Sequence, residues 1–349
     1  MRILFCQSVP YLPQDQGGAL SNTDALCRRL QMRGHEVSVL AKARRGPGPL
    51  PQVLKLGEGK SDRLGYPVQR VHDPLAAARS ICCTHPPHLA IIQLGDIAGL
   101  CHVFSEAGIP SIAYIHDIHS LPVNNIGISS SAVRYAACSQ FVASWIRKRV
   151  DCEAPVIPVL IEPSCYRTVT ERRVVTFVNP IPRKGAEIVF ALAAHRPDIP
   201  FEFIEAWRLR NRVKSYLAAR AAHHGNIRFI PNTSDMRPIY SRSRVVIAPS
   251  LYDEAWGRVV SEAQINTIPA LASNSGGLPE AVGPGGLVVD RYAPIYEWLS
   301  ALSSLWDNIV NYNRLSEYAA SHAARLEFQP DAIVDRALSV FFKHAGMSS

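Results

Sequence analysis

Two glutamates separated by seven residues, Glu254 and Glu262, carry the strongest chemical signal in this sequence. Glu254 follows a β-branched run at 245–248, and Glu262 lies in a segment with helical spacing. The next apolar run, 270–273, leads to the turn Gly-Gly-Leu-Pro-Glu at 276–280, where paired glycines allow a close approach of backbone and ligand. Strand, turn, helix and strand predict a βαβ unit that binds a nucleotide or phosphate beyond its strand ends.

A basic pair, Arg183 and Lys184, stands between a predicted strand at 174–178 and a predicted helix at 186–195, with Gly185 at the turn. Side-chain charge and the free N–H groups of a helix amino terminus both attract a diphosphate. A solvated pair in a loop is the default interpretation of such residues. The two glutamates downstream favour the phosphate role.

Near the amino terminus, Gly17 and Gly18 follow the strand 2–7 and open a helix, for which Ser21 or Asn22 is a suitable cap. The dinucleotide pattern GxGxxG is absent, which disfavours a dehydrogenase. A glycine pair at this turn indicates either contact with a ligand or tight packing, and the sequence leaves both open.

His116 follows the predicted strand 109–115 and therefore stands where the ligand sites of parallel sheets lie. There it can act as a general base, a hydrogen-bond donor or a structural side chain. Asp117 and His119 have no further carboxylate or cysteine at metal-ligand spacing, so no metal site is predicted.

Composition places the chain among soluble, reduced, two-domain proteins. Its 349 residues exceed one ordinary core, and 47% are hydrophobic while 19% are charged. It has no apolar run of about 18 residues and no signal-peptide pattern at its start, so we expect a cytoplasmic protein. The eight cysteines lack CxxC spacing and predict neither zinc nor disulfides. The net charge of +8 is spread over short clusters, typical of solvated faces with some attraction for anionic lipid or an anionic donor, and no nucleic acid is expected.

Alternating apolar strands and amphipathic helices predict an α/β protein with two Rossmann-like domains. We expect the first at 1–165, the second at 172–329 after a polar linker at 164–172, and a terminal helix at 330–349 that packs on the first domain. Further expected elements are a strand at 156–161, helices at 296–311 and 313–327, and exposed loops at 42–70 and 119–131.

With Gly17-Gly18, Gly34 to Val37, His116-Asp117, Lys184-Gly185, the two glutamates and the 276–280 turn in this order, nearly the whole chain resembles the family-four (group 1) retaining glycosyltransferases of the GT-B fold. The resemblance implies two domains facing across a cleft, with a nucleotide-sugar held by the second. It also implies activity without a cofactor or metal.

The resemblance implies roles for individual residues. Lys184 and Arg183 would neutralise the diphosphate, Glu254 would lie near the donor sugar, and Glu262 would bind the ribose hydroxyls. His116 would lie beside the anomeric carbon, which makes His116, Lys184 and Glu254 the predicted catalytic group. The remaining predicted donor-binding residues are Gly18, Trp256, Gly257, Arg258 and Val259.

Departures from the family pattern keep alternatives open. Asn179-Pro180 stands where Gly-Arg is common, Ala255-Trp256 replaces Pro-Phe, and Thr267 occupies a position that is often glycine. A nucleotide-sugar epimerase or hydrolase, or a non-catalytic nucleotide-sugar-binding partner, would fit the same fold. A transferase would use a glycan, lipid-linked or small-molecule acceptor, in glycan, glycolipid or surface polysaccharide synthesis, and we expect peripheral contact with the inner face of the membrane.

Overall fold

The computed structural model describes residues 1–44, 64–119, 133–207, 209–233 and 235–346. The chain forms two compact units, one of Met1–Leu160 with Pro330–Ser349 and the other of Ile161–Gln329. The predicted return of the terminal helix to the first domain is thereby confirmed. The predicted loop at 119–131 and most of that at 42–70 lie outside the described residues.

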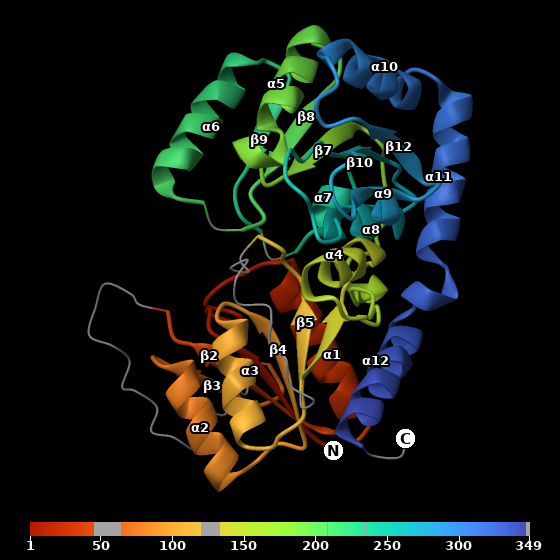
Figure 1. The fold of residues 1–349 in the computed structure, drawn as a ribbon. Coiled ribbons are helices and arrows are strands. Elements are labelled where there is room, and N and C mark those ends of the chain that lie inside the picture. Colours follow the sequence, from red (N-terminus) through yellow and green to blue (C-terminus); the bar gives the residue numbers. More distant parts are fainter. Residues whose placement is uncertain (45–63, 120–132, 208, 234, 347–349) are drawn as a thin grey trace. The chain divides into compact units, whose positions relative to one another are not determined.

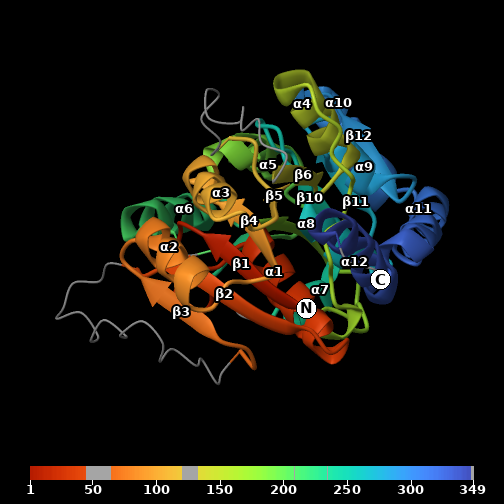
Figure 2. The same ribbon diagram turned by 60° about the horizontal axis from the view of Figure 1, so that its bottom comes forward.

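The first unit is built on a six-stranded parallel sheet in the order β3-β2-β1-β4-β5-β6. Its strands are β1 (Arg2–Gln7), β2 (Glu36–Lys42), β3 (Val68–Val71), β4 (Leu89–Leu94), β5 (Ser111–Ile115) and β6 (Val133–Ala137). Runs such as Leu-Ala-Ile-Ile in β4 are buried on both faces, as parallel strands covered by helices require. Figure 2 shows β1, β2 and β3 side by side at one edge.

Five described helices complete this unit. They are α1 (Gly18–Met32), α2 (Pro74–Thr84), α3 (Ile97–Glu106), α4 (Gln140–Val150) and α12 (Pro330–Ala345). Helix α12 lies beside α1 (Figure 1), where Arg33 pairs with Asp335 at 2.8 Å and with Asp331 at 3.1 Å. These exposed pairs contribute little energy, so the buried face of α12, with Phe341 fully covered, provides most of the attachment.

The second unit repeats the architecture with a parallel sheet in the order β12-β11-β10-β7-β8-β9. Its strands are β7 (Val174–Val178), β8 (Phe201–Ile204), β9 (Ile227–Ile230), β10 (Ser243–Ala248), β11 (Ala270–Ser273) and β12 (Gly286–Val289). Its helices are α5 (Ala186–His195), α6 (Asn211–His223), α7 (Arg237–Tyr240), α8 (Arg258–Gln264), α9 (Leu278–Val282), α10 (Ile295–Trp306) and α11 (Ile309–Ala323), with short 3-10 turns at Pro163–Cys165, Pro182–Lys184 and Leu326–Phe328.

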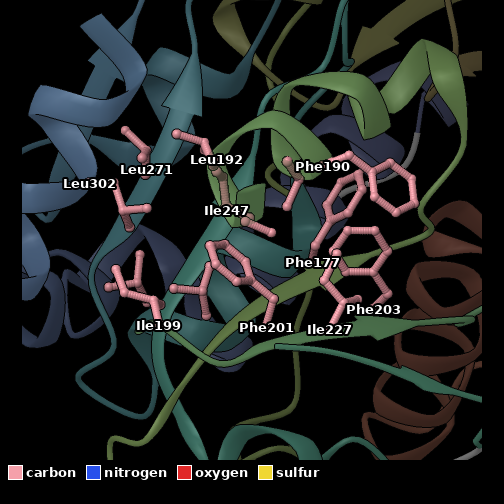
Figure 3. Packing of buried hydrophobic residues seen from close by; sticks show 14 of the residues in the cluster. Phe177, Phe190, Leu192, Ile199, Phe201, Phe203, Ile227, Ile247, Leu271 and Leu302 are labelled. Carbon is pink, nitrogen blue, oxygen red and sulfur yellow. The ribbon is translucent and has the colours of Figure 1, made fainter. Parts of the chain in front are cut away.

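An aromatic cluster forms the centre of the second unit's core. The rings of Phe177 and Phe203 lie 5.3 Å apart, and Phe190 of α5 lies 4.9 Å from Phe203 (Figure 3). Edge-to-face and tilted rings at these separations add to the hydrophobic gain. The cluster fixes α5 on the sheet, and with it the loop that precedes this helix.

Three expectations about individual elements are wrong, and two elements were not predicted. Helix α1 begins at Gly18 without a side-chain cap, so Asn22 lies inside the helix rather than at its start. At 156–161 there is only an isolated bridge from Val156 to Ala137. Helices α10 and α11 meet at Asn308, whose side chain accepts the N–H of Asn311 at 3.0 Å and starts α11 earlier than periodicity predicts. Strand β3 and helix α2 had no predicted counterpart.

The polar segment 164–172 is attached to the second unit rather than free between the two. The N–H of Thr168 donates to Asn266 Oδ1 at 2.7 Å, and the N–H of Glu171 donates to the Ser241 carbonyl at 2.6 Å. The chain therefore passes from one unit to the next directly after Leu160.

Among the described helices, none combines the length and hydropathy needed to cross a membrane.

Candidate functional site

Sheet topology brings the two strongest motifs together. In both units the first strand has the second and third strands on one side and the fourth to sixth on the other, the order of doubly wound nucleotide-binding sheets. In the second unit the order reverses between β7 and β10, and ligands bind at such a reversal, beyond the carboxyl ends of the strands. Lys184 follows β7 and Glu254 follows β10.

Lys184 and Glu254 form an ion pair at this position. Their side chains are only 16% and 13% exposed, so neither charge is fully solvated. Ser250 Oγ donates to the same Glu254 oxygen at 2.5 Å, and the ammonium lies 5.2 Å from the Tyr252 ring centre and 5.4 Å from that of Trp207. Burial opposes the charge on Lys184, but Glu254 and Tyr252 outweigh it and raise the pKa of the lysine above its usual value. The site thus holds a permanent cation in a partly dry, aromatic setting.

The loop between β7 and α5 has a defined backbone conformation. Asn179 adopts a φ of 60°, which asparagine tolerates better than most residues, and its Oδ1 accepts the N–H groups of Ala206 and Trp207 at 3.0 and 3.1 Å. The asparagine that replaces a more common glycine thereby fixes the turn that carries Trp207 beside Lys184.

Thr267, between α8 and β11, also stands where the glycosyltransferase pattern often has glycine. It has a φ of 58° and carries the strain that a β-branched residue incurs there.

Gly185 is required by both conformation and space. Its φ is 83°, and a Cβ at this position would overlap the carbonyl oxygen of Pro249 in the neighbouring loop. The close contact holds the Lys184 loop against the Glu254 loop.

We expect Gly185→Ala to lower the free energy of unfolding by about 2 kcal/mol, because it adds backbone strain to a clash with main-chain atoms that cannot rotate away. Urea unfolding of the variant checks this value. Gly225→Ala is the matched control, since a Cβ at Gly225 meets nothing within 4 Å. Equal stability of the two variants would contradict the proposed role of Gly185.

The paired glycines of the 276–280 turn approach the protein's own backbone. A Cβ on Gly276 would overlap the main chain of Glu254, and the N–H of Gly277 donates to the Glu254 carbonyl at 2.7 Å. The sequence predicts that these glycines allow backbone to approach a ligand closely. In the structure they pack closely against the loop that carries Glu254. The turn thus sets the position of Glu254.

Glu262 lies in a buried polar cluster. Arg258, one helical turn earlier on α8, pairs with Glu262 Oε1 at 2.9 Å, and the Tyr240 hydroxyl donates to Oε2 at 2.7 Å. Arg258 also donates to the Tyr166 hydroxyl at 3.0 Å. Burial raises the pKa of Glu262 above its usual value, and the contacts with Arg258 and Tyr240 oppose that rise. Both charged side chains are at least 88% covered.

The remaining residues of the predicted donor-binding segment serve packing in the second unit. Trp256 is 6% exposed and donates to Ser261 Oγ at 2.9 Å, and its ring lies tilted at 5.5 Å from the Phe328 ring. Gly257 precedes α8 with a φ of 113°, and Val259 packs against the buried cluster at the end of β7. Arg183 is exposed and lies over the Tyr252 ring at 5.2 Å. Their contact with a donor stays a prediction.

In the first unit, Gly18 is the exposed first residue of α1 and His116 directly follows β5. The His116 ring lies 4.0 Å from the Tyr114 ring, and its Nε2 is 3.4 Å from Asn22 Nδ2. The described residues contain no group of three or more histidine, cysteine and acidic side chains able to hold a metal ion.

Five side chains that contact Lys184, Glu254, Arg258 or Glu262 were not predicted from the sequence: Trp207, Tyr240, Ser250, Tyr252 and Tyr166. Ser250 and Tyr252 stand beside Glu254 in the sequence, so their polarity was an available signal. Tyr166, Trp207 and Tyr240 belong to segments that only the folded chain brings near the two glutamates.

Most of the second unit matches a known protein family. Residues 166–322 match the family described as glycosyl transferases group 1. Two D-inositol 3-phosphate glycosyltransferases are similar over a shorter stretch: that of Corynebacterium kroppenstedtii is 35% identical over 100 residues, and that of Corynebacterium glutamicum is 38% identical over 92. These alignments cover 28% and 26% of this chain, and this chain spans only 22% of the length of each relative.

Solved structures share the fold along the whole chain. A glycosyltransferase from Rickettsia africae superposes with a TM-score of 0.79 at 14% identity, covering 99% of this chain and 100% of the other. Anabaena HepE, solved in complex with UDP and glucose, gives 0.78 at 17% identity and covers 98% and 100%. At such identities the likeness establishes the two-domain glycosyltransferase fold alone, and this confirms the predicted fold class.

Proposed function

We propose that this chain, whose residues 166–322 match the group 1 glycosyl transferases, transfers a sugar from a nucleotide-sugar to an acceptor hydroxyl. The observation that carries the proposal is the Lys184–Glu254 pair at the strand-order reversal of the second sheet. A fixed cation next to a hydrogen-bonded carboxylate suits a ligand that joins a diphosphate to a polyhydroxylated sugar.

Lys184 has the central chemical role in this proposal. When the bond from the anomeric carbon to the diphosphate breaks, negative charge grows on the leaving phosphate, and a preorganised cation lowers the barrier. Glu254, freed from Lys184 by the donor, accepts hydrogen bonds from sugar hydroxyls. Glu262, held by Arg258 and Tyr240, accepts those of the ribose. Arg183 adds an exposed second charge beside Tyr252.

We further propose retention of the anomeric configuration by same-face substitution. Glu254 is hydrogen-bonded to Ser250 and paired with Lys184, so it is suited to binding rather than to attack on carbon. The departing phosphate then assists deprotonation of the acceptor hydroxyl, and His116 hydrogen-bonds near the anomeric carbon. NMR of the product linkage tests this mechanism; an inverted linkage rules it out.

Thermal shift with nucleotides is the first test of donor binding. We expect UDP or a UDP-sugar to raise the melting temperature, since HepE was solved with UDP; GDP, ADP and their sugars are the comparison set. A ligand at 100 times its Kd stabilises the folded state by about 2.7 kcal/mol. For a chain of this size, that free energy raises the melting temperature by several degrees at most.

The matched control for the thermal shift is Lys184→Ala, which should lose most of the response to nucleotide-sugar. If no nucleoside diphosphate or its sugar shifts the wild-type melting temperature, the nucleotide-binding proposal fails. If the sugar is released to water without an acceptor requirement, the hydrolase reading is favoured instead.

The proposed acceptors belong to glycan, glycolipid or surface polysaccharide synthesis, and the basic surface would support peripheral contact with an anionic membrane.

A further inference from the structure

Asn22 of α1 is fully buried and contacts two groups of the first unit. Its Oδ1 accepts the backbone N–H of Leu160 at 2.7 Å, and its Nδ2 lies 3.4 Å from His116 Nε2. Neither contact follows from the sequence, because Asn22 is far along the chain from both residues.

The first contact determines the orientation of the Asn22 amide. A backbone N–H can only donate, so the atom that faces Leu160 must be the carbonyl oxygen, and the NH2 group must face His116.

An NH2 group facing Nε2 of a neutral imidazole requires a lone pair on that nitrogen, which places the ring proton on Nδ1. The Tyr114 ring, 4.0 Å from the His116 ring, restricts ring rotation. Helix packing, rather than solvent, thus decides which ring nitrogen can donate.

We propose that Asn22 is a positioning residue that holds neutral His116 in the Nδ1–H tautomer. The amide also ties His116 to Leu160, the last residue before the chain enters the second unit. The tautomer follows from contacts within the first unit and is independent of the reaction; its effect on transfer rests on the proposed function. There, the ring proton of His116 would lie on Nδ1 and not on Nε2.

The test is long-range 1H–15N NMR of the full-length protein labelled with 15N-histidine, with the His116 signals assigned by their loss in His116→Gln. The nitrogen that couples to both ring C–H protons is Nε2. We expect it to show the downfield shift of an unprotonated nitrogen, while Nδ1 is protonated. A protonated Nε2 in neutral wild-type His116 would overturn the proposal.

Asn22→Asp is the matched variant, because one carboxylate oxygen still accepts the Leu160 N–H while the other replaces the donor with an acceptor. We expect Nε2 to become protonated in this variant, with the circular dichroism spectrum unchanged. A tautomer unaffected by the substitution would also refute the role of Asn22. Under the proposed function, Asn22→Asp lowers kcat by about tenfold or more; a shifted tautomer with unchanged kcat would leave the positioning intact and remove His116 from the chemistry.

Discussion

Replacing Lys184 with alanine is expected to lower kcat by at least about a hundredfold while the protein stays folded. The removed ammonium is the only charged partner of Glu254 that the described contacts include, and it would neutralise the leaving diphosphate. A hundredfold loss corresponds to about 2.7 kcal/mol of transition-state stabilisation, the range seen for single preorganised groups. Initial rates of nucleotide release, with the donor found by thermal shift, measure the change.

Lys214→Ala is the matched control for this experiment. Lys214 also pairs with a buried carboxylate in the second unit, Glu205, at 2.8 Å, so its loss perturbs packing and charge in a comparable manner. We expect kcat within about threefold of wild type for this variant. A Lys184→Ala enzyme as active as the Lys214→Ala enzyme would remove Lys184 from the leaving-group role.

Replacing Arg258 with methionine is expected to cost about 3 kcal/mol of folding free energy at neutral pH. Methionine fills a similar volume, but Glu262 is left 8% exposed with its charge uncompensated, and breaking a buried pair in this way typically costs 3–5 kcal/mol. The Tyr240 hydroxyl still donates to Glu262, which places the loss at the lower end of this range. Urea unfolding of wild type and variant measures the difference.

The same variant predicts a specific pH dependence. Burial already raises the pKa of Glu262 in the folded state, and removal of Arg258 raises it further. A carboxyl group with a raised folded-state pKa stabilises the protein fully below its unfolded pKa of about 4.3 and less as the pH rises through the folded value. The stability gap between Arg258→Met and wild type should therefore narrow as the pH falls from 7 toward 5.

A double variant separates charge from packing. Arg258→Met with Glu262→Gln removes the buried charge, so most of the lost stability should return, and the pH dependence should disappear with it. If the single and double variants are equally unstable, Arg258 acts through packing around Tyr166 rather than by compensating Glu262.

The architecture and the positions of the motifs can be predicted from the amino-acid sequence. Apolar runs such as Val174–Val178 and Leu89–Leu94 are typical of buried parallel strands, and the alternation with helices predicts doubly wound sheets. Lys184 and Glu254 could be assigned to one site because both follow strands of such a sheet. The boundaries of α10 and α11 could not be predicted, because the Asn308 cap outweighs hydrophobic periodicity in setting where α11 starts.

The partners of the functional side chains are set by tertiary packing. Composition and spacing carry no information on contacts such as Tyr240 with Glu262, Trp207 with Lys184 or Asn22 with His116, because each joins segments whose separation in space depends on the packing of several elements at once. The same applies to the glycines at 276 and 277, whose flexibility was evident but whose contact with Glu254 was not. Local sequence thus places the charged groups at the strand ends, and packing sets their orientation and protonation.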